Sequence, residues 1–286
     1  MKLQTPVADE KCKVGISYKD KIMMLGSCFT DNIGRQLADY GFDVCINPFG
    51  TLYNPASIAS AIERLVSMKP FTQDDCVEIG AGDRRICSFH HHTSFSGNDA
   101  EEFLEKANES LARAASFFRG CNKVIITLGT SWCFRHIGSD SIVANCLKHP
   151  ASEFRRERLS PEEISVLLRQ ITATSCGSPK EYIFTVSPIR HFKDGAHGNQ
   201  LSKAGLLLGI DSAIDGRADY FPAYEIVMDE LRDYRFYAED MCHPSSQTVE
   251  YIGERFLGWA LPDEERSILE ENIRKYRQSR HIEKQR

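Results

Sequence analysis

The chain has 286 residues, 42% of them apolar, so it is long enough to bury a full hydrophobic core. Its formal net charge of −5 offers no basic field, which argues against nucleic acid as the main partner. The 10 cysteines include no C-x-x-C pair, and the N-terminus lacks the apolar stretch of a secretory signal, so we expect reduced thiols and a cytoplasmic location. No segment approaches the ~20 apolar residues that a membrane-spanning helix requires.

Short apolar runs alternate with helical patterns along the chain. Apolar runs that end at Gly, Ser or Pro are typical of strands covered on both faces, and apolar residues three and four apart are typical of amphipathic helices. This alternation predicts an α/β fold with a mostly parallel sheet and helices on both faces. The predicted elements are strand 21–26, helix 30–40, strand 43–50, helices 55–68 and 100–118, strand 123–129, helix 160–174, strand 181–188 and helices 199–214 and 247–260.

We expect a single domain over residues 1–286. Its core is predicted to extend over about 21–260, where the strand and helix patterns lie. The segment 74–98 has no long apolar run and is predicted to be a β-rich insertion over one edge of the sheet. The charged segment 262–286 is predicted to form a solvated C-terminal helix.

The ends of the predicted strands carry the chemistry-bearing residues. Ligands of parallel α/β sheets gather at the carboxyl ends of the strands. These ends read G-S-C-F at 26–29, N-P-F-G at 47–50, L-G-T-S-W at 128–132 and S-P-I-R-H at 187–191. Asp240 and His243 follow later, three residues apart and just before the helix predicted at 247–260.

Ser27, Asp240 and His243 together suit acyl transfer. A serine hydroxyl needs an imidazole to take its proton and a carboxylate to orient that imidazole. Ser27 also opens a helix, where free N–H groups and the helix dipole favour a developing oxyanion. Taken separately, Gly-Ser at a strand end is also typical of a helix cap, and Asp-x-x-His of a cap with a surface histidine.

Several long motifs resemble one known family. They occur in a single order from about Lys21 to about Trp259 and together are similar to the GSCFA domain family, which is placed with the SGNH (GDSL-like) hydrolases. The resemblance implies a flavodoxin-like three-layer α/β/α sandwich, Ser27 as nucleophile, the Asp240 and His243 pair, and a hydrolase or esterase activity. The motifs are G-S-C-F, N-P-F-G-T-L-Y-N-P, L-G-T-S-W, V-S-P-I-R-H-F-K-D-G, H-G-N-Q-L-S-K-A, Y-F-P-A-Y-E-I-V-M-D-E-L-R-D-Y-R-F-Y and D-M-C-H-P-S.

The chain departs from this pattern at two places. Thr30 stands where the family motif ends in Ala. The wider superfamily implies a Gly in its second block and a G-x-N in its third, both serving the oxyanion hole. Gly50 can stand for the first, with its backbone N–H as a donor, but the third block here reads Gly-Thr-Ser from residue 129 and lacks the Asn. Thr130, Asn47 and Ser131 are the candidates for the missing side-chain donor.

Other polar residues have two interpretations each. Arg190 and His191 lie in a polar loop after a strand and are predicted to contact substrate, with ordinary loop packing as the alternative. The histidines in "FHHHTSF" at 89–95 suggest a metal, but neighbours in a strand point to opposite faces and no acid or cysteine completes a ligand set. We therefore expect no metal and no cofactor. Cys28 is predicted to point into the fold.

These patterns predict a serine esterase that removes small O-acyl groups, acetyl above all, with acylated carbohydrate as one substrate. The expected partner is a small-molecule or glycan ester, with no nucleic acid and no membrane. Two alternatives remain open. The fold could serve as a catalytically silent binding module, or the acyl group could pass to an alcohol as in an acyltransferase.

Overall fold

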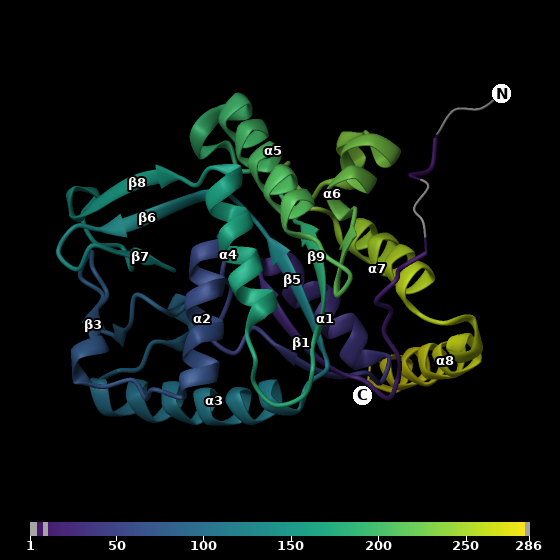
Figure 1. Cartoon of the computed structure of the whole chain (residues 1–286), viewed down its shortest axis with the longest axis horizontal. Coiled ribbons are helices and arrows are strands. Elements are labelled where there is room, and N and C mark those ends of the chain that lie inside the picture. Colours follow the sequence, from purple (N-terminus) through teal and green to yellow (C-terminus); the bar gives the residue numbers. More distant parts are fainter. Residues whose placement is uncertain (1–4, 8–10, 284–286) are drawn as a thin grey trace.

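A parallel sheet of five strands runs through the centre of the computed structural model, which describes residues 5–7 and 11–283 (Figure 1). The strand order is β10-β9-β5-β1-β2, and every neighbouring pair is parallel. The predicted α/β fold with a parallel central sheet is confirmed. The strands are β1 (Lys21–Gly26), β2 (Asp43–Ile46), β5 (Lys123–Leu128), β9 (Glu181–Val186) and β10 (Ala218–Phe221).

The helices follow the predicted patterns closely. Several N-termini have a capping side chain, such as Asn54, which accepts from the Ser57 N–H, and Ser160, which forms a capping box with Glu163. The helices are α1 (Cys28–Asp39), α2 (Pro55–Ser67), α3 (Ala100–Gly120), α4 (Pro161–Ala173), α5 (Gly195–Ala213), α6 (Ala223–Glu225), α7 (Ser246–Ala260) and α8 (Arg266–Glu283). None of these helices combines the length and apolar composition needed to cross a bilayer.

Both faces of the sheet are covered, which explains the continuous apolar runs of its strands. In β1, Met23 and Leu25 join a core cluster with residues of α2, α3, α4 and α5. Ile22 and Met24 join a second cluster, on the opposite face, with residues of α1 and α7. Alternate side chains of β1 therefore enter different cores, so both sets are apolar.

A second, antiparallel sheet lies beside the main one and was not predicted. It has the order β7-β6-β8 and is formed by β6 (Trp132–His136), β7 (Ser141–Val143) and β8 (Phe154–Arg158). Most residues of β6 and β8 are partly exposed, and β8 reads F-R-R-E-R, so no apolar run marks these strands. Figure 1 shows this sheet on the opposite side of the molecule from α8.

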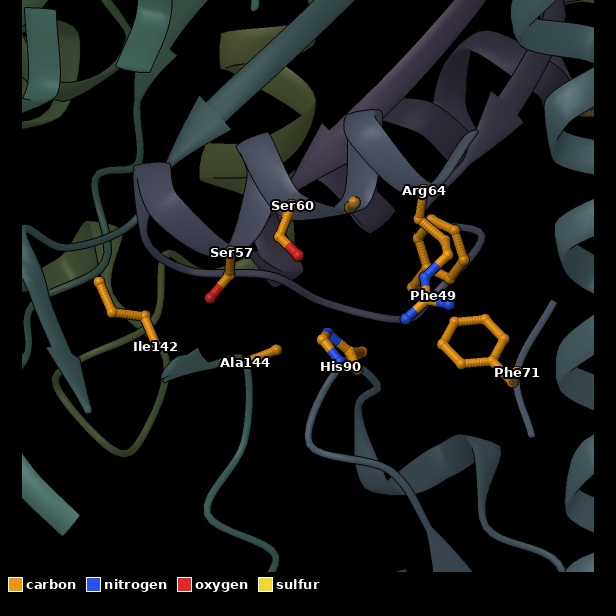
Figure 2. Close-up of a pocket in the computed structure, with 9 residues that line it drawn as sticks. Phe49, Ser57, Ser60, Arg64, Phe71, His90, Ile142 and Ala144 are labelled. Atoms are coloured by element: carbon orange, nitrogen blue, oxygen red, sulfur yellow. The ribbon is translucent and has the colours of Figure 1, made fainter. Parts of the chain in front are cut away.

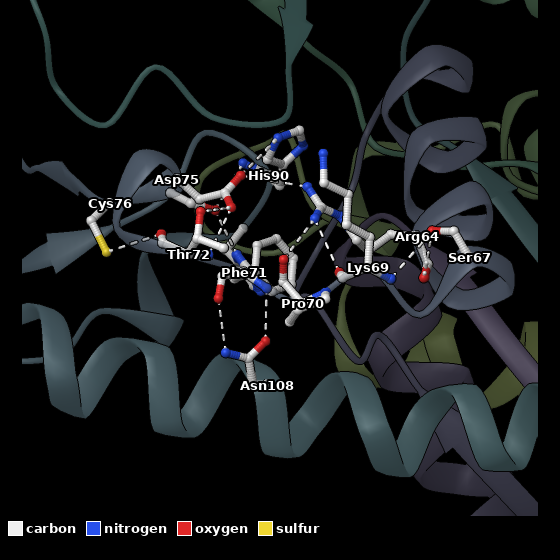
Figure 3. A network of polar contacts seen from close by, with 12 residues as sticks. Arg64, Ser67, Lys69, Pro70, Phe71, Thr72, Asp75, Cys76, His90 and Asn108 are labelled. Carbon is white, nitrogen blue, oxygen red and sulfur yellow. Dashed lines mark hydrogen bonds and ion pairs between the residues drawn. The ribbon is translucent and has the colours of Figure 1, made fainter.

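The segment 74–98 contains little regular strand structure. Its strands β3 (Val77–Glu78) and β4 (Ile86–Cys87) pair over two residues each, and the remainder is turns. The loop before it is tied to two helices (Figure 3). Arg64 of α2 donates to the Lys69 and Pro70 carbonyls and pairs with Asp75, and the Asn108 amide of α3 forms two hydrogen bonds with the Phe71 backbone.

His91 shows what the histidine run does structurally. Its side chain is fully buried, and its Nδ1 lies 2.7 Å from the Ser88 Oγ. Burial, followed by nearby positive charges, lowers the pKa of His91 to about 3. The imidazole is therefore neutral and acts as a core residue. The rings that contact it belong to Phe49, Phe71, Phe95 and Phe103.

Acid should weaken the fold through this residue. Unfolded His91 takes up a proton near its ordinary pKa of ~6.5, whereas the folded form stays neutral to about pH 3. Its contribution to stability is thus complete above pH ~6.5 and is lost as the pH falls toward the folded value, by roughly 2–3 kcal/mol at pH ~4.5. Urea unfolding across this pH range measures the free energy of unfolding, which should depend less steeply on pH in His91→Gln than in the wild type. The exposed His197→Gln should keep the wild-type slope, and equal slopes for both variants would contradict this account.

Candidate functional site

The carboxyl ends of β1 and β5 lie side by side at the point where the order of strand addition reverses. In chain order the five strands have the arrangement 2-1-3-4-5, and the switch between the two directions falls between β1 and β5. Ligands of open parallel sheets bind at such a switch point. A Cβ on Gly129 would lie 3.5 Å from the Cβ of Ser27 and 3.2 Å from the Tyr53 carbonyl, so these strand ends are in close contact.

Gly26 allows the turn that leads from β1 into α1. Its φ is +146°, and a Cβ there would lie 2.3 Å from the Thr127 carbonyl oxygen. The side chain of Asn47 braces this turn, because its Oδ1 accepts from the Gly26 N–H at 2.8 Å and its Nδ2 donates to Asp31 at 2.7 Å. Asn47 is buried, so its amide supports the backbone of the turn.

Ser27 occupies the N-cap position of α1, but its side chain does not cap the helix. The side chain is 0% exposed, and its Oγ has no hydrogen-bond partner among the described residues. Its N–H donates to the Thr127 carbonyl at 3.2 Å. A buried hydroxyl without a partner costs free energy, so Ser27 is an unsatisfied polar group at the switch point.

Cys28 is the first residue of α1, and its side chain is partly exposed. The side chain packs against the core cluster that α1 and α7 share, in line with our expectation that Cys28 is directed into the fold. Burial, followed by the Asp31 charge, raises the pKa of the Cys28 thiol, while the N–H groups of Cys28 and Phe29 and the Lys203 ammonium oppose the rise. The thiol thus lies near the positive end of α1, a position that favours an anion.

Asp240 and His243 form an intact pair. The His243 Nδ1–H donates to the Asp240 carboxylate at 2.6 Å, and the N–H groups of Cys242 and His243 donate to its other oxygen at 2.9 Å. These N–H groups are the main reason that the pKa of Asp240 is lowered to about 2. Both side chains are 51% exposed, so the imidazole faces solvent and its orientation comes from Asp240.

Arg190 and His191 connect this pair to the end of β9. The Arg190 N–H donates to the Cys242 carbonyl at 3.0 Å, and its guanidinium donates to the Met241 carbonyl at 3.2 Å. Burial, followed by the positive charges of Lys203 and His243, lowers the pKa of His191 to about 4. The His191 Nε2 is buried and has no hydrogen-bond partner among the described residues.

The structure does not complete the predicted triad. Ser27 lies at the end of β1, and the Asp240–His243 pair lies at the same edge of the sheet, on the loop that Arg190 holds next to β9. Within the part of the chain that the structure describes, no hydrogen bond joins His243 to Ser27. The Asp240 carboxylate and the His243 imidazole are therefore in contact with each other, but the imidazole does not contact Ser27.

The expected oxyanion donors are already used. The Gly50 N–H donates to the Asn47 carbonyl at 2.8 Å, and Gly50 is required for its turn, since φ is +77° and a Cβ would lie 2.4 Å from the His92 Cβ. The Thr130 hydroxyl lies 2.9 Å from the Ser202 Oγ and accepts from the Trp132 N–H.

The remaining side-chain candidate is engaged in the same way. Ser131 is fully buried, and both its N–H and its hydroxyl donate to the Ser202 Oγ. The N–H groups of Cys28 and Phe29 are placed differently, because the first N–H groups of a helix have no acceptor within it. They are the donors that α1 itself directs toward this site.

Lys203 was missed in the sequence because it lies within an apolar helical pattern. Its side chain is 1% exposed, and its Nζ donates to the carbonyls of Gly129 and Ser187, both at 2.7 Å. Burial lowers the pKa of Lys203 to about 7. The motif H-G-N-Q-L-S-K-A contains this lysine, but only its burial identifies what it does.

The cavity beside the histidine run is too small for a substrate. It has a volume of about 10 Å³, enough for a single water molecule. Figure 2 shows Ser60 and Arg64 of α2 on one side of this space and His90 on the other. Among the described residues, no group of three or more His, Cys, Asp or Glu side chains is arranged to hold a metal ion.

The fold and the site define an α/β protein with a carboxylate–imidazole pair at the carboxyl edge of a parallel sheet. The model of the GSCFA family matches residues 21–256, which include β1 through nearly all of α7. The chain belongs to the GSCFA family. Searches of curated proteins and of solved structures gave no match.

Lys203→Met should destabilise the protein. Methionine fills similar space but leaves the Gly129 and Ser187 carbonyls without their buried donor, so the free energy of unfolding should fall by about 2 kcal/mol or more. Urea denaturation measures the change. Lys69→Met, which removes a surface ammonium, is the matched control and should be neutral. Equal stability of the two variants would show that the Lys203 contacts are unimportant.

Proposed function

We propose that the protein is an acyl-ester hydrolase of SGNH type, in which the Asp240–His243 pair activates a nucleophile on the turn between β1 and α1. The observation that supports this most is the oriented pair itself, with a 2.6 Å contact and a carboxylate whose other oxygen is held by two N–H groups. Its location at the carboxyl edge, just before α7, also suits the three-layer arrangement of that superfamily.

The proposed reaction has two halves. His243 takes the proton of the nucleophile, which attacks the ester carbonyl, and the tetrahedral intermediate expels the alcohol with that proton. Water, activated by the same imidazole, then hydrolyses the acyl-enzyme and releases the acid. The N–H groups of Cys28 and Phe29 stabilise the oxyanion. Small O-acyl groups, acetyl above all, are the groups that we propose the enzyme removes. The alcohol that carries them is a small molecule or a glycan.

Ser27 is the nucleophile in the first form of this proposal. Because its Oγ is fully buried and unpartnered, the turn after Gly26 has to shift before the hydroxyl can reach His243 and an ester. The unsatisfied hydroxyl gains a hydrogen bond from such a shift, which favours it. Thr130 and Ser131 then serve to fix the neighbouring strand end through Ser202.

Cys28 is the second candidate, and its exposure is the observation that favours it. Its side chain is partly exposed and lies by the first N–H groups of α1, whereas the Ser27 side chain is fully buried. The reaction would then pass through a thioester with the same base. All 10 cysteines are unpaired, which agrees with a reducing, cytoplasmic location for a protein of this kind.

The nucleophile can be identified with Ser27→Ala, Cys28→Ala and Cys28→Ser. With Ser27 as nucleophile, Ser27→Ala should lose at least ~1,000-fold in turnover of a short p-nitrophenyl ester and all fluorophosphonate labelling, while its stability stays equal or rises because the lost hydroxyl has no partner. With Cys28 as nucleophile, Cys28→Ala and Cys28→Ser should instead lose turnover, and wild-type protein should carry an iodoacetamide label at residue 28 in peptide mapping. Full turnover in both alanine variants would refute a nucleophile on this turn.

The role of the pair can be tested with Asp240→Asn. The amide keeps the shape but cannot hold the imidazole in the required tautomer, so kcat/KM should fall by about 100-fold or more. Because the pKa of Asp240 is about 2, its carboxylate stays ionised across the usual assay range and should add no acidic limb above pH ~4. Asp263→Asn, at a carboxylate paired with Lys11 on the surface, is the control. Wild-type kcat/KM in Asp240→Asn would contradict the assignment.

A binding module and an acyltransferase make different predictions from the same site. A silent binding module would show neither labelling nor turnover in the wild type. An acyltransferase would give an ester product when a second alcohol is added.

A further inference from the structure

The guanidinium of Arg190 lies among exposed aromatic rings beside the Asp240–His243 pair. Its centre is 4.5 Å from the Phe192 ring centroid, 5.3 Å from that of Tyr234 and 5.2 Å from that of Tyr237. Phe192 is 41% exposed and Tyr234 is 64% exposed. Large rings open to solvent around one cation are unusual on a surface that has only to stay soluble.

Arg190 and the two tyrosines, but not Phe192, line a cavity of about 190 Å³. Arg190, Tyr234 and Tyr237 meet the side chains of Val227 and Met228 there. The volume is well below the ~300 Å³ of the smaller drug-sized sites, which points to a ligand group of a single ring. The remaining lining residues are Arg232 and Asp233.

The charges around the cavity leave Arg190 available. Arg232 pairs with Asp229 at 3.4 Å, and Asp233 pairs with Arg235 at 3.0 Å. Among the described residues, no carboxylate forms an ion pair with Arg190, and its only side-chain hydrogen bond is to the Met241 carbonyl. A guanidinium has five N–H donors in a planar fork that matches a carboxylate, so Arg190 has donors left for an anion.

The backbone that lines the cavity is also unusual. Residues Ile226–Leu231 form a π-helix, and Arg232 follows with φ of +47°. π-helical turns are rare and are frequent at functional sites. Val227 and Met228 come from this π-helix, so the distorted segment supplies the apolar side of the cavity.

We propose that this cavity is a substrate subsite that binds a sugar ring bearing a carboxylate. The carboxylate pairs with the Arg190 fork, and the apolar face of the sugar ring stacks on Tyr234, the most exposed ring. Arg190 contacts the carbonyls of Met241 and Cys242, so a ring held here presents its O-acyl groups to the pair next to it. The subsite rests on the proposed function only for that last step.

Direct binding tests the subsite without requiring any turnover. Glucuronate and glucose differ only at the group attached to C5, and calorimetric titration of each into the wild-type protein compares them. Glucuronate should bind at least ~10-fold more tightly than glucose, and Arg190→Gln should abolish the difference. Arg113→Gln, which alters an exposed arginine of α3 that is paired with Glu109 and lies outside the cavity, should preserve it. Equal affinity for the two sugars, or an unchanged preference in Arg190→Gln, would overturn the proposal.

Kinetics then connect the subsite to the reaction. With O-acetyl glucuronate as substrate, Arg190→Gln should raise KM by about 10-fold or more, whereas KM for O-acetyl glucose should stay within about 3-fold. Any fall in kcat from the lost Met241 contact should be the same for both esters. Arg190→Lys keeps the charge but loses the fork, and should give an intermediate KM for the acid. Glucuronate binding without hydrolysis of either ester would refute the esterase and support the subsite. Hydrolysis of both esters without a preference for O-acetyl glucuronate would support the esterase and refute the subsite.

Discussion

The buried ammonium of Lys203 is the interaction on which the arrangement of this site depends. It joins the carbonyls of Gly129 and Ser187, which follow the ends of β5 and β9 and lie beyond the regular strand pairing. Gly129 contacts Ser27, and Ser187 leads into Arg190 and on to the Asp240–His243 loop. Burial of a cation is unfavourable, and the two carbonyls offset that cost only in this geometry. A single side chain of α5 therefore sets the spacing of both strand ends.

Positive potential gathers at this edge of the sheet. Lys203, Arg190 and the N-terminus of α1 all contribute to it, and the charge of Lys203 helps to keep His191 neutral. The main local carboxylate, Asp240, is held by N–H groups and by the imidazole. An edge of this kind favours negative charge on a reacting oxygen and on a bound ligand, which is why the proposed hydrolysis and the proposed carboxylate subsite fit the same region.

Ser27 and Cys28 illustrate how a turn separates adjacent residues. Gly26 passes directly against the backbone of β5, so the next side chain is pressed between strand ends and the following one opens the helix. One polar group is thus buried without a partner, and its neighbour is partly exposed at a helix N-terminus. Neither the residue types nor their spacing distinguishes these two environments.

The sequence by itself determined the α/β class, the main strands and helices, and the Asp240–His243 pair. Periodicity is a local property, and the pair is closed by a three-residue spacing within one loop. It did not reveal β6 and β8, because half-exposed strands rich in Arg and Glu carry no apolar run, nor β10, a four-residue edge strand with two partly exposed positions. Only the tertiary structure decided the burial of Ser27, the use of the Gly50 N–H within its own turn, the contacts of Lys203 and the cavity at Arg190. Each of these depends on groups that are distant in the chain, such as Lys203 and Gly129, 74 residues apart, and burial of this kind is decided only when the strands and helices have packed.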